Sequence, residues 1–588
     1  MIRSILNLIL SYRFWQLLKI QEIFLLEIMG LSSWALLGSL LVCNTALAED
    51  IWRSKLYPLD WKPGHKDSNG NFLHDFSFAG YKRGEKEIPI FSKTMKVDVT
   101  EDVFGADPTG IKESTTGIQA AIDFVGKSGG GIVHIPVGVY RIKPAQDKAF
   151  TLKISYDNVI LRGDGVDKTF LFNDEPYMRH RKVIFITPRG PSNWHSSTEL
   201  SVDIVQDLTE PTTRIPLSDV SHFKENDQIV IISDATDSFL TEHDMLGYWS
   251  QDTLGGPIFY RQIVKIDSEV KIVEIDIPTR YYLLRRDHAR IYKIDSYIEG
   301  VGIENLSIGM RENPKPNISS FDWYFRDTAG YEVHNSHVIF IRNAIDCWVQ
   351  KVNTFRPKGN QRKYHILSHG IKITASRNIT IRNCDFRYPQ YKGRNGNGYL
   401  YSISGSDCLI QNCIAVGGRH NFSFSGIQAT GNVIHRCVSK HGQLPSDFHR
   451  NLSIANLIDN MTLKKDWLEA RYRLGSLSGL LNSKVHGHPT TQSVFWNTRG
   501  IAYHPQSGSV IIDSRQVGQG YIIGTQGLCH KITLRPLTIW LKLTQYLFSR
   551  NTAPDDFVEG VGTGNLLSPE SLYEDQLDKR LRSVRELN

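Results

Sequence analysis

The sequence lacks both the cysteine spacing of a metal site and the basic runs of a nucleic-acid-binding protein. None of its 7 cysteines forms a CxxC pair, so a zinc cluster is not indicated. No dense Lys/Arg run with interleaved aromatic residues is present, which argues against a nucleic-acid partner. The formal net charge of +7 over 588 residues is a mild excess that weakly favours an acidic partner.

Residues 1–48 have the character of a signal peptide region. The stretch "MGLSSWALLGSLLVCNTALAED" has an apolar core and ends near Ala46-Leu47-Ala48, a small-x-small pattern after which we expect cleavage. The residues before Met29 are also apolar, so Met29 is a candidate start, and an uncleaved membrane anchor is the alternative. We therefore expect a secreted, periplasmic or cell-surface protein that contacts a membrane only through an uncleaved N-terminal segment.

Short strand-like segments recur through the middle of the chain. The segments "ITIRNCDF", "CLIQNCIAV" and "NVIHRCVSK" carry a cysteine at the same point, and "CWVQKVNTF" carries a valine there. The steps along Val352, Cys384, Cys413 and Cys437 are 32, 29 and 24 residues. Strand repeats of this period without long helices predict a β-solenoid. The aligned cysteines are then small inward side chains, and a disulfide arrangement is the less favoured alternative.

The stretch "FGADPTGIKESTTGIQAAIDFVGKSGGGIVHIPVGVY" predicts a helix followed by a strand. Ser114 or Thr115 can N-cap the helix. Four apolar residues then follow at helical spacing: Ile118, Ala121, Ile122 and Val125. An open solenoid end exposes unpaired strand edges, so we expect this amphipathic helix to be an N-terminal capping helix.

The same stretch, followed by "VILRGDGVDKTFL", resembles the start of the pectate-lyase-like right-handed parallel β-helix superfamily. That superfamily includes polysaccharide lyases, polygalacturonase-type hydrolases and phage tailspikes. The resemblance covers about residues 99–530 in outline, although its specific motif lies in the first 75 of these. It implies an all-β, right-handed parallel β-helix and a polysaccharide partner, and it says little about the reaction.

We divide the chain around this β-helix. Residues 49–98 are expected to form an N-terminal entry segment, 99–530 the β-helix, and 531–588 a tail whose helix caps the far end. A β-rich insertion at about 176–300 and a long, partly helical loop at about 445–489 are expected because both stretches interrupt the rhythm of the coils. Insertions on solenoids often form the walls of a binding site.

Histidine and basic residues indicate where a site lies. Nine of the 20 histidines fall between His365 and His504. Basic residues also follow the Val352–Cys437 ladder at similar offsets, so stacked coils would align them into a basic groove for an acidic glycan. The predicted catalytic residues are Arg419, His420, His441, His449 and His486. The predicted substrate-binding residues are Arg356, Arg387, Asn421, Lys440 and Trp496, of which Trp496 either stacks on a sugar ring or packs in the core.

These residue types favour a lyase that cleaves a uronate-containing glycan by β-elimination. Such an enzyme needs a base and a group that neutralises the uronate carboxylate. A glycoside hydrolase needs paired acids, for which Asp407 with Asp447 is the remaining candidate pair. A glycan-binding surface protein without catalysis is a further alternative. No cofactor is required, and no carboxylate cluster for Ca²⁺ stands out in the stacked segments, so Ca²⁺ is only an option.

Overall fold

The computed structural model describes residues 50–90, 95–195, 200–473, 486–534 and 552–587. The predicted signal peptide, 1–48, lies outside these residues. Contacts divide the chain into two units, Met1–Trp52 and Arg53–Asn588, and the elements below belong to the second unit. Within the described ranges, no helix is long and apolar enough to cross a membrane.

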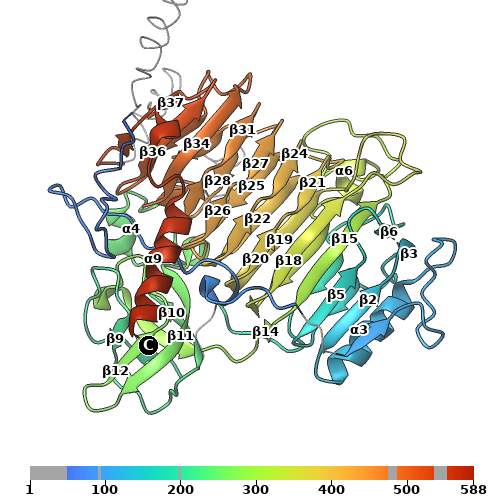
Figure 1. Cartoon of the computed structure of the whole chain (residues 1–588), viewed down its shortest axis with the longest axis horizontal. Helices are drawn as coiled ribbons and strands as arrows, with labels where there is room; N and C mark the ends of the chain where they lie inside the picture. Colours follow the sequence, from blue (N-terminus) through green and yellow to red (C-terminus); the bar gives the residue numbers. More distant parts are fainter. Residues whose placement is uncertain (1–49, 91–94, 196–199, 474–485, 535–551, 588) are drawn as a thin grey trace, which may run out of the picture. The chain divides into compact units, whose positions relative to one another are not determined.

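Two long parallel sheets form the coils (Figure 1). In the described part of the chain, the first sheet has 18 strands: β1 Lys96–Asp98, β2 Gly131–Ile135, β3 Gly138–Ile142, β5 Val159–Gly163, β6 Thr169–Asn173, β15 Gly302–Met310, β18 Trp348–Thr354, β20 Thr380–Arg382, β21 Asp385–Arg387, β23 Leu409–Gln411, β24 Ile414–Val416, β26 Val433–His435, β27 Val438–Lys440, β30 Leu457–Asp459, β31 Thr462–Lys464, β34 Val494–Ala502, β36 Tyr521–Gly527 and β38 Phe557–Glu559. Each strand pairs in parallel with its counterpart in the next coil, as β20 does with β23 and β23 with β26.

The second sheet lies across the coil from the first and carries most of the polar groups discussed below. Its main path in the described residues is β4 Phe150–Ile154, β7 Lys182–Ile186, β16 His337–Arg342, β19 His369–Arg377, β22 Tyr399–Ser406, β25 His420–Phe424, β28 Ser446–Phe448, β32 Leu468–Arg471, β35 Ile512–Arg515 and β37 Ile532–Thr533. All pairings along this path are parallel. The predicted parallel β-helix is therefore confirmed.

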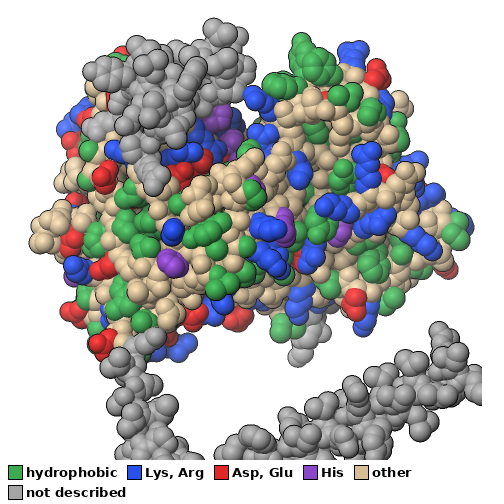
Figure 2. Space-filling view, turned by 90° about the horizontal axis from the view of Figure 1, so that it is seen from above, with side chains coloured by type: hydrophobic (Ala, Val, Ile, Leu, Met, Phe, Trp, Pro, Cys, Tyr) green, Lys and Arg blue, Asp and Glu red, His purple; other side chains and the backbone are tan. Residues whose placement is uncertain are grey.

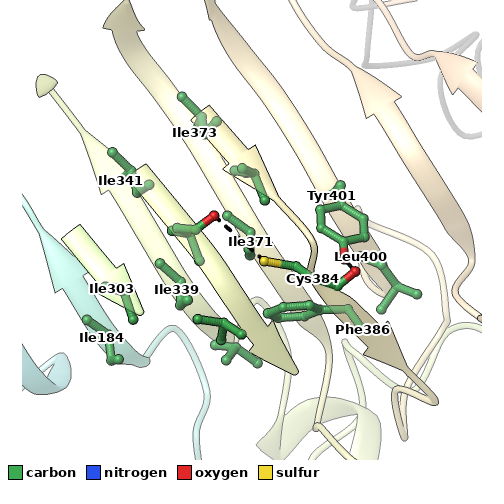
Figure 3. Packing of buried hydrophobic residues seen from close by; sticks show 14 of the residues in the cluster. Ile184, Ile303, Ile339, Ile341, Ile371, Ile373, Cys384, Phe386, Leu400 and Tyr401 are labelled. Atoms are coloured by element: carbon green, nitrogen blue, oxygen red, sulfur yellow. Dashed lines mark hydrogen bonds between the residues drawn. The ribbon is translucent and has the colours of Figure 1, made fainter. Parts of the chain in front are cut away.

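Small and branched apolar side chains fill the space between the two sheets. Figure 3 shows isoleucines of successive strands, with Cys384, Phe386 and Tyr401, packed into one core. Val352, Cys384, Cys413 and Cys437 are all at most 1% exposed, and the described cysteines are free thiols. The inward ladder that the sequence predicted is therefore present, without disulfides.

A left-handed residue precedes each of the three cysteines of the ladder. Asn383, Asn412 and Arg436 have φ values of 55°, 53° and 49°, and each separates two short strands of the first sheet. Asn tolerates this conformation because its short side chain forms local hydrogen bonds, so the "RNC" and "QNC" patterns mark the corners of the coils. The corner turns the chain so that the following cysteine faces the core.

The predicted N-terminal helix is α3, Thr115–Lys127, which lies beside β2 at the end of the solenoid that contains β1–β3 (Figure 1). The four apolar residues named above are 0% exposed and pack into the main core. The cap differs from the expectation in one respect. Ser114 is the N-cap, but its hydroxyl accepts from the backbone N–H of Asp107 at 2.9 Å and not from the helix.

An antiparallel insertion interrupts the coils. Its six-stranded sheet consists of β8 Val202–Asp203, β9 Arg214–Pro216, β10 Gln228–Ile232, β11 Ile258–Asp267, β12 Ile272–Ile275 and β13 Arg290–Lys293. Two short helices follow β10: α4 Asp237–Glu242 and α5 Gln251–Leu254. The insertion begins later than predicted, because β7 inside the expected range 176–300 pairs with β4 and β16 as a coil strand.

The prediction of a long loop at about 445–489 is wrong for much of 446–471. Strands β28, β29 Ser453–Ile454, β30, β31 and β32 occupy much of 446–471 and continue both sheets. Leu468–Arg471, expected as part of a helix, is strand β32. Pairing with neighbouring coils overrides the local helical pattern of this segment.

The C-terminal helix also differs from its prediction as an end cap. Helix α9, Leu572–Leu587, crosses the flank of the first sheet (Figure 1). Asp459 on β30 accepts hydrogen bonds from the Tyr573 backbone N–H at 2.9 Å and the Ser571 hydroxyl at 2.7 Å. Arg580 donates to Ser77 Oγ at 2.8 Å, so the helix also ties down the entry segment.

Candidate functional site

A cleft of about 1330 Å³ opens over the second sheet. Figure 2 shows a hollow in this face, with His, Lys and Arg side chains in its wall. Its floor comes from β19, β22 and β25, and its walls include the aromatic side chains of Phe321, Trp323 and Trp467. Polar lining residues come from at least five coils, so the parallel stacking of strands brings together groups far apart in the sequence.

Four aromatic rings stack on one another, one from each of four adjacent strands, and three of them, from β19, β22 and β25, line the floor. His337 on β16 stacks on His369 on β19, with ring centroids 4.5 Å apart. His369 stacks on Tyr399 on β22 at 5.5 Å, and Tyr399 on His420 on β25 at 4.8 Å, with interplanar angles of 11° and 9°. Parallel pairing places equivalent residues one above another, so this ladder holds the Tyr399 and His420 rings in fixed orientations.

Tyr399, His449 and Asp447 form a hydrogen-bonded relay beside this ladder. The Tyr399 hydroxyl lies 3.1 Å from His449 Nε2, and His449 Nδ1 lies 3.0 Å from Asp447 Oδ2. A carboxylate can only accept, so Nδ1 of His449 carries the proton and Nε2 accepts from the phenol. The arrangement aligns a phenol, an imidazole and a carboxylate, and it allows a proton at the phenol oxygen to pass to the imidazole.

Electrostatics keep the Asp447 carboxylate ionised. Its side chain is 0% exposed, and Arg473 Nη1 lies 2.7 Å from Oδ2. Burial opposes the charge, but His420, Arg473 and His449 outweigh it and lower the pKa of Asp447 below its ordinary value. Burial, followed by the nearby Asp447 charge, raises the pKa of Tyr399. The phenol is therefore a proton donor at neutral pH.

His420 offers the complementary group, a proton acceptor. Its Nδ1 lies 2.6 Å from the Pro445 carbonyl oxygen and 3.2 Å from Asp447 Oδ2, so Nδ1 carries the proton. Its Nε2 is buried and has no hydrogen-bond partner. Burial lowers the pKa of His420 to about 3 despite the attraction of Asp447. The ring is neutral, with a free lone pair on Nε2.

Besides Arg473, four cationic side chains line the cleft: Lys372, Arg394, Arg419 and Arg450. No ion pair recorded among the described residues involves any of these four, and Arg419 Nε is buried without a partner. Burial, followed by Arg450 and Lys182, lowers the pKa of Lys372 to about 8, so Lys372 is mainly protonated at neutral pH. Unpaired cations in a partly buried cleft suit an anionic ligand.

The structure brings together four of the five residues predicted as catalytic. Arg419, His420, His449 and His486 all line the cleft, and the His486 and His449 ring centroids are 5.5 Å apart. His441 does not lie there. It is an exposed residue directly after the end of β27 in the first sheet. Its neighbours there include Lys465, Lys464, Lys363 and Lys440.

The predicted basic stripe divides between the two sheets. Register aligns Arg387 with Val416, Lys440 and Lys464 on the first sheet. By contrast, His420 is the first residue of the second-sheet strand β25, and Arg419 directly precedes it. Arg387 is held by Asp385, with Nε 2.6 Å from Oδ1, and Arg356 donates to the Asn360 carbonyl oxygen at 3.1 Å. Arg356, Arg387 and Lys440 therefore do not belong to the cleft.

Two predicted substrate-binding residues are buried away from any ligand. Asn421 is 0% exposed, and its amide donates to Ser439 Oγ at 2.8 Å and the Lys440 carbonyl oxygen at 3.0 Å. Trp496 is also 0% exposed, and its Nε1 donates to the Pro569 carbonyl oxygen at 3.2 Å. Neither side chain can reach a sugar. The prediction for Asn421 is wrong, and of the two alternatives for Trp496 the structure supports packing in the core. The aromatic side chains in the cleft walls are Phe321, Trp323 and Trp467 instead.

The carboxylate pair considered for a hydrolase is also wrong. Asp407 is 0% exposed and lies between two arginines of the insertion. Arg261 Nη1 is 2.9 Å from Asp407 Oδ2, and Arg280 Nη2 is 2.7 Å from Oδ1. Asp407 therefore anchors the insertion to the coils and is not available to pair with Asp447 across a substrate.

Sequence reasoning missed three residues of the site. Tyr399 and Lys372 lie on strands whose alternation, "YLYSISGS" and "GIKITAS", was visible but was not assigned to a sheet face. Arg473 fell in the range predicted as a loop. Alternation places Lys372 on the outward face of its strand but gives Tyr399 the parity of the core residue Tyr401. Only the structure shows that Tyr399, at the start of β22, lines the cleft.

His420, Asp447 and His449 also have the residue types of a metal site. One ligand atom from each lies within 4.8 Å of the others. The Arg473 guanidinium, however, already contacts the carboxylate oxygen that a metal would share. Two imidazoles and a single carboxylate are also a poor donor set for Ca²⁺, which takes six to eight oxygen ligands. The residues present fit a hydrogen-bonded relay better than a metal site.

Comparison with known proteins gives relatives that act on polysaccharides according to their names. No family model matches the chain. The capsule K1-specific depolymerase of Klebsiella phage K64-1 is 24% identical over 323 residues, or 52% of this chain and 32% of the relative. Alginate lyase 7 of Azotobacter vinelandii is 32% identical over 108 residues, or 18% and 13%. Mannuronan C5-epimerase AlgE1 of the same organism is 38% identical over 68 residues, or 12% and 5%.

The chain thus spans a third or less of the length of each of these curated relatives. Among solved structures, the A-module of Azotobacter vinelandii mannuronan C-5 epimerase AlgE4 aligns over 79% of this chain and 96% of its own, at 12% identity and a TM-score of 0.36. The tailspike protein gp49 from Pseudomonas phage LKA1 aligns over 73% and 76%, at 12% identity and 0.36. The chain is a parallel β-helix protein with the resemblance to the pectate-lyase-like superfamily that its sequence indicated.

Proposed function

We propose that this protein is a polysaccharide-active enzyme that removes the proton beside a uronate carboxyl group and cleaves the glycan by β-elimination. The observation that carries the proposal is the juxtaposition of His420, an unprotonated imidazole, with Tyr399, a protonated phenol, under a group of unpaired cations. Neighbouring groups with opposite protonation states are the usual mark of an acid–base pair. The relatives' names support the polysaccharide as substrate class, and the charge of the cleft supports an acidic one.

Each step of the reaction has a residue in the cleft. His420 Nε2 accepts the proton from the carbon beside the carboxylate, while Arg419, Arg450 and Lys372 stabilise the negative charge that develops on the carboxyl group. The glycosidic C–O bond breaks as the C=C double bond forms. The Tyr399 hydroxyl protonates the departing oxygen, and the resulting phenolate regains a proton from solvent as His420 releases the one it has taken up. Asp447 stays ionised and orients His449.

Hydrolysis has less support from the geometry. An inverting or retaining glycosidase needs one carboxyl group that is protonated at working pH. Asp447 is held ionised, and Glu469 in the same cleft is paired with Arg473 Nε at 2.6 Å. Because both acids are engaged by the same arginine, neither is available as a general acid. We place the action outside the cytoplasm, as the predicted signal peptide implies, and we expect no metal requirement.

The proposal is tested by incubating the protein in D₂O with polymannuronate, polygalacturonate and neutral dextran. β-Elimination on an acidic polymer gives ultraviolet absorbance from unsaturated ends together with new reducing ends. Reducing ends without this absorbance would mean hydrolysis and would overturn the proposal. Solvent deuterium incorporated beside the carboxyl group, without chain cleavage, would keep the proton abstraction but replace elimination by epimerisation. Binding without any chemistry would indicate a glycan-binding protein.

A further inference from the structure

An aromatic and basic platform extends the cleft toward the N-terminal coils, over β7, β16 and β19. Phe185 on β7 and Phe340 on β16 stack with ring centroids 5.5 Å apart. Both rings are partly exposed and are adjacent in register. Lys182 Nζ lies 5.7 Å from the Phe185 centroid and 5.8 Å from that of Phe340. The Arg342 guanidinium lies 6.0 Å from the Phe185 centroid.

Lys372 joins this platform to the cleft. Its Nζ lies 5.5 Å from the Phe340 centroid, and the same side chain lines the cleft. Parallel register then places Lys372 next to Ser402 on β22, the strand that also carries Tyr399. Adjacent strands are about 4.8 Å apart, so the three steps from β22 to β7 span about 14 Å. The distance from the strand of Tyr399 to the far strand of the platform is therefore longer than a single sugar ring.

The cations of the platform lack opposing charges. Among the ion pairs of the described residues, none involves Lys182, Arg342 or Lys372, although Lys182 Nζ donates to the His180 carbonyl oxygen at 2.9 Å. Burial and then the neighbouring Arg342 lower the pKa of Lys182. Like charges crowd a half-buried surface here, and an anionic ligand would relieve their repulsion.

On the opposite side of the cleft, the acidic side chains are paired with arginines. Beyond Ser423, the same outward register passes through Asp447, Glu469 and Asp513. Each of these acids has an arginine partner, and Arg471 Nε lies 3.1 Å from Asp513 Oδ2. This side has no excess of cations, and its carboxylates would repel a uronate. The charge of the floor is thus unequal on the two sides of the Tyr399–His420 pair.

We propose that the platform of Lys182, Phe185, Phe340 and Arg342 is a set of subsites for an anionic polysaccharide, which extends from the cleft in one direction only. The proposal rests on the proposed function for the position of the reacting sugar. Its physical basis is separate, because partly exposed aromatic faces offer apolar contact to sugar rings while the cations pair with the carboxylates. A glycan too short to leave the cleft does not reach the platform.

The test compares the affinity of short and long oligomers of mannuronate and galacturonate by calorimetry. The double variant Lys182→Gln/Arg342→Gln should bind decamers at least tenfold more weakly than the wild type, while dimers bind equally. The matched control is Lys440→Gln/Lys464→Gln, which removes two charges from adjacent coils of the first sheet. It should bind both lengths as the wild type does. Circular dichroism checks that both variants fold.

Three results would overturn the inference: unchanged decamer affinity in the platform variant, an equal loss in the control, or an equal loss for a neutral dextran oligomer. Turnover is measured separately on the wild type, so the two proposals can fail independently. A platform-dependent affinity without any turnover would leave the platform standing and remove the enzymatic proposal. Elimination together with binding that does not depend on oligomer length would support the enzymatic proposal and remove the platform.

Discussion

The Tyr399→Phe variant tests the proposed relay most directly. The change removes the hydroxyl that lies 3.1 Å from His449 Nε2 and leaves the ring stacked between His369 and His420. A positioned general acid contributes roughly 10²–10⁴-fold to a rate, which corresponds to about 3–5 kcal/mol of activation free energy. We therefore expect turnover to fall by roughly that factor.

The cost in stability should be much smaller. Tyr399 is 7% exposed. The phenylalanine ring of the variant stays buried in the same place, so no apolar contact is lost. One hydrogen bond is lost, which costs the free energy of unfolding roughly 1–2 kcal/mol. Turnover is measured from the ultraviolet absorbance of unsaturated ends, and stability from urea unfolding. A variant that keeps more than about a tenth of wild-type turnover would refute the role of Tyr399 as the acid.

Tyr401→Phe is the matched control for this experiment. Tyr401 lies two residues further on β22 and faces the core (Figure 3). Its hydroxyl donates toward the carbonyl oxygens of Cys384 and Ile414, each at 3.1 Å. The same chemical change should therefore cost a similar amount of stability and leave turnover unchanged. Equal loss of turnover in both variants would mean that strand β22 is disturbed and that the relay is not tested.

Four further predictions follow from the charges and thiols of the structure. Arg473→Gln leaves the buried Asp447 carboxylate without its permanent cation, and we expect urea unfolding to show a loss of about 3–5 kcal/mol. Burial raises the pKa of Asp459 to about 7 despite hydrogen bonds from α9, and Glu574 and Arg436 have smaller effects. The folded state therefore binds one more proton than the unfolded state between about pH 4 and 7. As the pH rises through this range, the free energy of unfolding should fall by at most about 4 kcal/mol. Asp459→Asn should remove this pH dependence. EDTA should leave turnover unchanged, whereas a loss that Ca²⁺ restores would show a metal requirement. Dithiothreitol should not shift the melting temperature, because the described cysteines are free thiols.

The Asp459 prediction has a specific physical origin. The carboxylate is fully buried under α9, and His435 Nε2 lies 3.2 Å from the Ser571 hydroxyl that donates to it. Burial favours the neutral carboxylic acid, so deprotonation weakens the docking of α9 on the flank. A pH-independent free energy of unfolding in the wild type, measured between pH 4 and 7, would contradict this account.

The repeat pattern was sufficient to predict the fold because its information is local. In three coils an alternating strand is followed by a corner and a cysteine, and a valine takes this place in the coil before them, so the inward ladder from Val352 to Cys437 could be read without a structure. The amphipathic face of α3 was visible for the same reason. The histidine-rich region also contains His420, His449 and His486, which line one cleft.

The composition of the site depended on information that is not local. Tyr399, His420 and Asp447 come from three successive strands of the second sheet, and equal counting from the cysteine ladder did not align them. Counting residues from each cysteine did not align the side chains, because the corners between strands differ in length. Lys440 is the last residue of β27 in the first sheet, whereas His420 is the first residue of β25 in the second sheet. Side chains meet across a solenoid according to hydrogen-bonded register, and register is settled only when neighbouring coils pair.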